Sequence, residues 1–170
     1  MGTPSSTYRL QFHQGLTLRR AVELVPYLSA LGVSHLYASP LLRACPGSTH
    51  GYDVCEHSRI NAEIGTEEEL EELVVALRRH DMGLVLDIVP NHMGICGRDN
   101  AWWWDVLKHG RSSRFAEYFD IDWESPDPRL CGKVLVPVLG DFYGRVMERG
   151  ELKLAHEQGH VVLCYYDHRF

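Results

Sequence analysis

The sequence has 170 residues, of which 45% are hydrophobic and 24% are charged. These proportions are typical of a globular protein, and this length supplies enough apolar residues for one core. The net charge of −6 argues against nucleic acid or an anionic membrane as a partner, because both require a basic surface. A neutral or cationic ligand fits this charge better.

The five cysteines are odd in number, widely spaced and never arranged as C-x-x-C, which favours neither a disulfide framework nor a zinc site. We therefore expect reduced thiols throughout. The N-terminus has no apolar segment of a signal peptide, and no later apolar run approaches the ~20 residues of a membrane span. These features predict a soluble, cytoplasmic chain. Gly2 with Ser6 matches a loose myristoylation pattern, but so short a motif assigns nothing. The cysteines are Cys45, Cys55, Cys96, Cys131 and Cys164.

The first elements predicted along the chain are a strand, a helix and a second strand. Residues 8–13 alternate and include aromatic side chains, which is typical of a strand. A helix follows from about Leu18, with Thr17 as its N-cap and with Pro26 expected to kink or divide it. Residues 33–37 predict the next strand.

The next part of the chain predicts a long loop, a helix and a third strand. The loop covers residues 38–65, and the helix begins with a capping box formed by Thr66 and Glu69. The apolar run 84–89 is the third strand. Alternating strands and helices with apolar strands imply parallel pairing and an α/β fold, either an open doubly wound sheet or the start of a (β/α)8 barrel. In both, chemistry lies in loops after strands, and a loop as long as 38–65 is usually functional.

Beyond Gly94 the alternation is lost. Residues 100–110 predict a short helix, residues 133–140 a strand, and residues 151–166 a hairpin that turns at residues 158–159. This pattern indicates a small, irregular, β-rich subdomain inserted after the third strand.

Two motifs receive no function. The sequence HEQGH, residues 156–160, matches the zinc motif H-E-x-x-H, but that motif requires a helix and the flanking residues predict strands. The tryptophans at 102, 103, 104 and 123 could stack on sugar rings, yet three consecutive residues of a helix cannot face one ligand, so a core role is favoured. His13 and His35 lie at or in strands and are left unassigned.

Asp87 stands in the apolar third strand, LDIVPNHM. A buried carboxylate costs several kcal/mol unless a cation or a hydrogen-bond donor meets it. No basic residue of the first three strands is well placed for this. The sequence therefore predicts a partner from chain that lies beyond these residues.

The run D-I-V-P-N-H at residues 87–92 resembles the first conserved region of the α-amylase family of glycoside hydrolases, D-x-x-x-N-H, at the end of barrel strand three. Gly51-Tyr52-Asp53, at the separation usual in that family, strengthens the resemblance. It implies the N-terminal part of a (β/α)8 TIM barrel, with strands one to three in residues 1–97 and the start of an inserted β-rich subdomain in residues 98–170. Cys45, where a basic residue is usual, and Glu56, where Asp is usual, depart from the pattern.

The resemblance also implies roles for individual residues. Tyr52 would be a stacking platform for the reacting glucose, and His92 a donor to its hydroxymethyl oxygen. Asp53 and His50 would also contact substrate. Asn91 would organise its loop, and Asp87 would support the site by pairing with an arginine on strand four. The implied substrate is a maltooligosaccharide, with no cofactor and no metal. These six residues are Tyr52, His92, Asp53, His50, Asp87 and Asn91.

Within the family, resemblance is greatest to the isomerases of trehalose biosynthesis, which convert maltooligosaccharides to maltooligosyltrehalose by intramolecular transglucosylation. Retaining chemistry of this kind uses a nucleophile and an acid/base, which the family carries after strands four and five. Both are expected beyond residue 170, so the chain alone should be inactive. The alternatives are another α-amylase-type glucan hydrolase or transferase, and a non-catalytic glucan-binding module.

Overall fold

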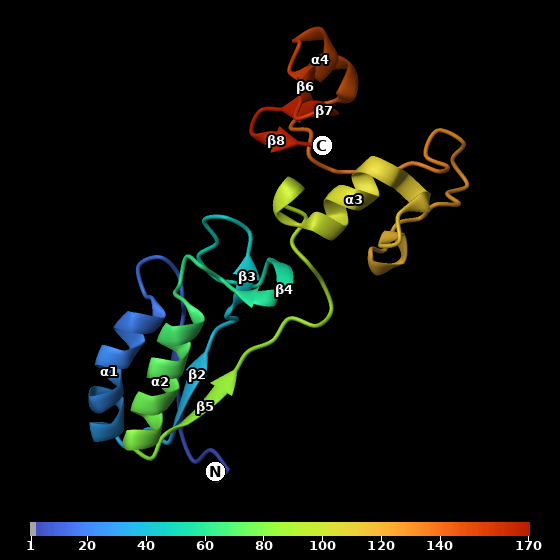
Figure 1. Ribbon diagram of the computed structural model, residues 1–170. Helices are drawn as coiled ribbons and strands as arrows, with labels where there is room; N and C mark the ends of the chain where they lie inside the picture. The colour runs from blue at the N-terminus through green and yellow to red at the C-terminus, as the bar shows by residue number, and fades with distance from the viewer. Residues whose placement is uncertain (1–2) are drawn as a thin grey trace. The chain divides into compact units, whose positions relative to one another are not determined.

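The structure is a computed structural model that describes residues 3–170, so the myristoylation candidate Gly2 lies outside the described part. The chain divides into two compact units, one ending at Cys96 and the other comprising Gly97–Phe170 (Figure 1). Within residues 3–170, no helix combines the length and the apolar character needed to cross a membrane.

The first unit is built on a three-stranded parallel sheet in the order β1-β2-β5. The strands are β1 (Thr7–Leu10), β2 (His35–Ala38) and β5 (Gly83–Leu86). The predicted parallel pairing is confirmed, and each strand is shorter than the apolar pattern suggested. The third predicted strand stops at Leu86, so Asp87 lies just past its end, half-buried, and not within the strand.

Two helices lie side by side against the sheet, α1 (Leu18–Ala30) and α2 (Glu67–Arg79) (Figure 1). The predicted capping box of α2, formed by Thr66 and Glu69, is present. The expected division of α1 at Pro26 is wrong, because the helix continues through it. Pro26 is exposed, while Val25 and Leu28 on either side of it are buried, so core packing holds the helix together across the missing hydrogen bond.

The two faces of this sheet differ in chemistry. One face packs on the helices through Leu10, Leu36 and Ala38, which belong to the buried core. The register pairs Arg9 with Tyr37, which places both on the opposite face, because side chains alternate along a strand. The sheet therefore separates an apolar, helix-covered side from a polar side. The core also includes Phe12, Leu18, Ala21, Val25, Leu28, Leu41, Ile64, Leu73, Leu77 and Met82.

The long loop after β2 contains a small antiparallel hairpin, β3 (Leu42–Ala44) and β4 (Val54–Ile60), which the sequence did not predict. Residues 55–59 are mostly polar and show no alternation, so nothing in the pattern marks a strand. The backbone of β4 is joined to the segment after β5 by a hydrogen bond, in which Gly94 N donates to Val54 O at 2.8 Å.

A disulfide joins Cys45, in this loop, to Cys96, with a Cα–Cα distance of 5.9 Å. The expectation of five reduced thiols is wrong for these two residues, whereas Cys55, Cys131 and Cys164 remain thiols. Cys45 and Cys96 are 51 residues apart in the sequence, so no local motif indicates that they pair. They meet because the loops after parallel strands converge at one edge of the sheet.

The second unit combines short helices with a three-stranded antiparallel sheet, β6-β7-β8. The predicted hairpin is confirmed and turns at Gln158 and Gly159, both with positive φ. Residues 133–140 form no strand, contrary to the prediction, because no neighbouring strand pairs with this apolar run. The elements are η1 (Gly97–Asp99), α3 (Ala101–His109), η2 (Gly110–Ser112), η3 (Ala116–Tyr118), α4 (Tyr143–Glu148), β6 (Leu152–Glu157), β7 (His160–Tyr165) and β8 (His168–Arg169).

The tryptophans of α3 have separate environments. Trp103 is buried at 5% exposure, with its indole N–H lacking a hydrogen-bond partner in the described structure, and Trp102 stacks on Phe115 with ring centroids 5.0 Å apart. Trp104 is half-buried under the guanidinium of Arg98. The predicted core role therefore holds for Trp103. The fourth tryptophan, Trp123, is half-buried.

Candidate functional site

Tyrosine hydroxyls meet the carboxylate of Asp87 on the polar side of the sheet. Tyr37, from β2, donates to Asp87 Oδ2 at 2.8 Å, and Tyr52, from the long loop, donates to the same oxygen. The expectation that the partner of Asp87 must come from chain outside the first three strands and their loops is therefore wrong. It considered basic residues alone, whereas the two donors are neutral phenols, and it overlooked Arg9 on the first strand.

Arg9 of β1 extends this network. Its Nη2 donates to the Tyr52 hydroxyl oxygen at 3.0 Å, and its guanidinium lies 5.6 Å from the centre of the Tyr37 ring. The Tyr52 hydroxyl, followed by Tyr37 and the charge of Arg9, lowers the pKa of Asp87 below its ordinary value of 3.8. The hydrogen bond to Asp87 raises the pKa of Tyr37 above its ordinary value of 10.0. Asp87 is thus an ionised carboxylate at neutral pH.

His92 joins the same cluster through the backbone of Tyr52. Its Nε2 lies 2.9 Å from the carbonyl oxygen of Tyr52, and its Nδ1 lies 3.0 Å from Asn91 Oδ1. A neutral imidazole donates from only one nitrogen, so Nε2–H donating to the carbonyl leaves Nδ1 as an acceptor. With the Asn91 amide turned so that its NH2 group faces Nδ1, both contacts are satisfied.

The remaining two predicted residues lie on the other side of Tyr52. The His50 ring stacks on the Tyr52 ring with centroids 6.1 Å apart, and its Nδ1 accepts from Tyr52 N–H at 3.0 Å. Asp53 Oδ1 lies 3.8 Å from His50 Nδ1 and accepts from the Ser48 hydroxyl at 2.5 Å. Tyr52 is therefore held at its hydroxyl, its carbonyl and its N–H.

Gly51 forms the turn that brings Tyr52 to the polar face of the sheet. Its φ of +76° lies in the left-handed region, and a Cβ built on it would lie 2.8 Å from the carbonyl oxygen of Pro40. Both facts require glycine, since any other side chain would be strained and would push the loop away from the residues that follow β2. The G-Y-D sequence is thus a turn that delivers Tyr52 to the sheet.

The structure brings all six predicted site residues into one continuous set of contacts centred on Tyr52. Sequence reasoning missed Arg9 and Tyr37, although alternation along the two strands predicts that they share a face. Of the histidines left unassigned, His13 forms a tight turn with Leu16, and His35 lies beside Gly83 in the sheet. Within residues 3–170, no group of three or more metal-ligating side chains is gathered.

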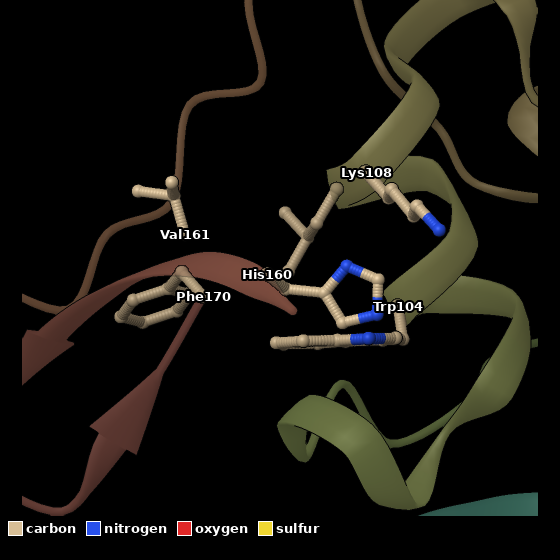
Figure 2. A pocket seen from close by; sticks show the side chains of 6 residues that line it. Trp104, Lys108, His160, Val161 and Phe170 are labelled. Atoms are coloured by element: carbon tan, nitrogen blue, oxygen red, sulfur yellow. The ribbon is translucent and has the colours of Figure 1, made fainter. Parts of the chain in front are cut away.

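A separate cavity of about 230 Å³ lies in the second unit. Figure 2 shows Trp104 and Lys108 reaching into it from α3, and His160 from β7. His160 belongs to the HEQGH motif and begins β7, while His156 lies in β6, so the two histidines are on paired strands and not on one face of a helix. The other residues lining the cavity are Leu107, Val161 and Phe170.

Comparison with known proteins finds relatives with two kinds of name, synthase and amylase. It is 50% identical, over 79% of its length, to a Mycobacterium tuberculosis protein that carries the name maltooligosyl trehalose synthase, and it spans 18% of that protein. It is 35% identical, over 63% of its length, to the intracellular maltogenic amylase of Bacillus subtilis, of which it spans 17%.

Its fold also matches a solved structure. The maltooligosyltrehalose synthase of Arthrobacter ramosus superimposes on 98% of this chain with a TM-score of 0.85 and 47% identity, and the match spans 21% of that protein. The family model described as the catalytic domain of alpha amylase matches residues 15–145. That match covers more than half of the sequence, and the chain therefore belongs to the α-amylase family.

Proposed function

We propose that this chain forms the N-terminal part of an enzyme that converts maltooligosaccharides to maltooligosyltrehalose, an intramolecular transglucosylation of trehalose biosynthesis. The observation that carries the proposal is the cluster in which Tyr52, fixed at three points, lies between the ionised Asp87 and His92. An aromatic face flanked by a carboxylate and an imidazole suits a sugar ring, which has apolar faces and hydroxyl edges. The names of the relatives give the same substrate class.

The fold supports this proposal in its finer detail. We assign β1, β2 and β5 to strands one to three of a (β/α)8 barrel, with their helix-free polar face turned to the barrel interior. Residues 98–170 are then the start of a β-rich subdomain inserted after strand three. In such barrels the active site lies at the carboxyl ends of the strands, where Asp87 follows β5.

In the proposed reaction, the residues of this chain bind and orient the sugar and do not transfer it. Tyr52 stacks on the reacting glucose, and His92, Asp53 and His50 contact its hydroxyl groups. Asp87, with Asn91 nearby, supports them. The nucleophile and the acid/base, which retaining chemistry holds ~5–5.5 Å apart, belong to strands four and five, outside these 170 residues. The isolated chain is therefore expected to be inactive.

A chimera tests the proposed reaction. The portion of the Arthrobacter ramosus synthase that aligns with this chain is replaced by residues 1–170, and the product from maltopentaose is analysed. We expect loss of reducing ends without hydrolysis, because the mutase consumes the terminal aldehyde. Replacing Tyr52 by alanine in the chimera should lower kcat/KM by at least tenfold. A correctly folded chimera that forms no non-reducing product would contradict the proposal.

The second candidate is a glucan hydrolase or another transferase of the family, favoured by the identity to the maltogenic amylase. A hydrolase releases new reducing ends from the same substrate, so the same assay separates the two reactions. A non-catalytic glucan-binding module would show binding in calorimetry and no turnover in any chimera.

The proposal retains a cytoplasmic location, which the intracellular maltogenic amylase among the relatives supports.

A further inference from the structure

We propose that Arg9 is a positioning residue, which holds the Tyr52 ring in the orientation that receives a sugar by fixing its hydroxyl against Asp87. This inference rests on the proposed function, because it assigns Tyr52 a sugar to stack on. Arg9 is assigned no role by the D-x-x-x-N-H or G-Y-D motifs, and it lies 43 residues before Tyr52 in the sequence.

The register of the sheet brings Arg9 to this place. Arg9, Tyr37 and Val85 are neighbours across β1, β2 and β5, and Asp87 follows Val85 by two residues, on the same side of the sheet. Tyr52 arrives from a different element, the loop after β2. Arg9 therefore links the rigid sheet to the loop that carries the proposed platform.

The direction of each hydrogen bond is fixed by chemistry. A guanidinium only donates, so the Tyr52 oxygen must accept from Arg9 Nη2. An ionised carboxylate only accepts, so the Tyr52 hydroxyl hydrogen must point to Asp87 Oδ2. With both sides of the phenol oxygen committed, the Tyr52 hydroxyl has one arrangement. Hydrogen bonds with a charged partner are about twice as strong as neutral ones, so both partners stabilise this orientation of the Tyr52 hydroxyl.

Gln11 holds the guanidinium itself. Arg9 Nη1 donates to Gln11 Oε1 at 2.6 Å, and Gln11 Nε2 donates to the carbonyl oxygen of Thr49, in the same loop as Tyr52, at 3.1 Å. Arg9 thus uses two nitrogens for two partners. A lysine ammonium has three donors at one point and lacks the planar fork, so it replaces the charge but not the spacing of the two nitrogens that contact Tyr52 and Gln11.

The proposal predicts an effect on sugar binding that a purely structural role would not produce. Without Arg9 the phenol still donates to Asp87, but the ring loses one of its fixed points and becomes free to tilt. Because one hydrogen bond is lost, we expect the sugar to bind about three- to tenfold more weakly, which is the usual effect of one hydrogen bond. Because the positive charge near Asp87 is also lost, the pKa of that carboxyl should rise toward its ordinary value of 3.8.

The test uses the 170-residue chain, with maltopentaose as the probe. The variants are Arg9→Ala, Arg9→Lys and, as the control, Arg59→Ala, which removes an exposed arginine that forms an ion pair with Glu56 on β4. Calorimetry measures maltopentaose binding, and carbon NMR follows the titration of the Asp87 carboxyl. We expect Arg9→Ala to weaken binding three- to tenfold and to raise the pKa of Asp87. Arg9→Lys should restore part of both effects, and the control should change neither.

Two binding results overturn the inference, and a third result separates it from the proposed function. Binding by Arg9→Ala equal to that of the original chain, with intact fold, contradicts a positioning role. An equal loss in Arg9→Ala and Arg59→Ala also contradicts it, because the effect would then be one of general charge. If the unmodified chain binds no maltopentaose, the proposed sugar site is wrong. The titration of Asp87 then tests separately whether Arg9 acts on the Tyr52–Asp87 pair. An unchanged pKa of Asp87 in Arg9→Ala contradicts that action, and a raised pKa supports it.

Discussion

The disulfide between Cys45 and Cys96 makes the stability of the first unit depend on redox conditions. It closes a loop with a sequence separation of 51 residues, which contains β4, α2 and β5. Cross-linking a loop of this length lowers the entropy of the unfolded chain by about 14 cal/mol/K, or about 4 kcal/mol at 25 °C. Because a domain is typically stable by about 5–15 kcal/mol, this is a large share of the total.

The perturbation is Cys96→Ser, which removes the cross-link and keeps the size of the side chain. Urea unfolding of the original and variant chains, without reductant, should give unfolding free energies that differ by about 2–4 kcal/mol, as natural disulfides usually do. Cys131→Ser is the control, since that thiol is exposed. Adding a dithiol reductant should bring the original chain to the stability of Cys96→Ser.

The result that refutes this reasoning is an unfolding midpoint that changes by the same small amount in Cys96→Ser and Cys131→Ser. Equal midpoints with and without reductant, in a chain shown by mass to hold the disulfide, would also refute it. Either result would mean that the contacts between the loop and the segment after β5, such as Gly94 N to Val54 O, already close the loop in the unfolded ensemble.

Four further outcomes are expected. Gly51→Ala should destabilise the chain by about 2–3 kcal/mol in urea unfolding, because alanine at positive φ is strained and its Cβ would meet the Pro40 carbonyl. Asp87→Asn should bring the pKa of Tyr37 back toward 10.0, seen as earlier tyrosinate absorbance in an alkaline titration. Because the pKa of Asp87 is lowered on folding, its stabilisation is present above about pH 4 and is lost as the pH falls through the folded value, so acid should cost the original chain more stability than it costs Asp87→Asn. Thr66→Ala should cost about 1 kcal/mol of unfolding free energy by removing the cap of α2, and an unchanged midpoint would contradict that role.

Local signals predicted the two helices and the three parallel strands of the first unit. The cap at Thr66 and Glu69 and the apolar stripe of α2 carry their information within a few residues, and the structure contains both. The hairpin that turns at Gln158 and Gly159 was predictable for the same reason, because strand-like runs flank a short segment that contains a glycine. By contrast, the apolar run 133–140 has a strand-like composition but no partner, and pairing cannot be read from composition.

The candidate site was predictable only in part. Motif resemblance supplied Tyr52, His92 and Asp87, but the donors to Asp87 come from residues 35 and 50 positions away, and no local pattern reports such distances. The Cys45–Cys96 disulfide was missed for the same reason. The alternation of side chains along β1 and β2 could have predicted that Arg9 and Tyr37 lie on one face of the sheet.

We propose that the residues around Tyr52 form one wall of a glucan site. The most direct measurement is carbon NMR of the tyrosine rings of this chain during titration with maltopentaose. We predict that the Tyr52 and Tyr37 signals move together with one saturating curve, while that of Tyr27, which is exposed on α1, stays constant. Shifts confined to other tyrosines, or none at saturating sugar, would contradict the account.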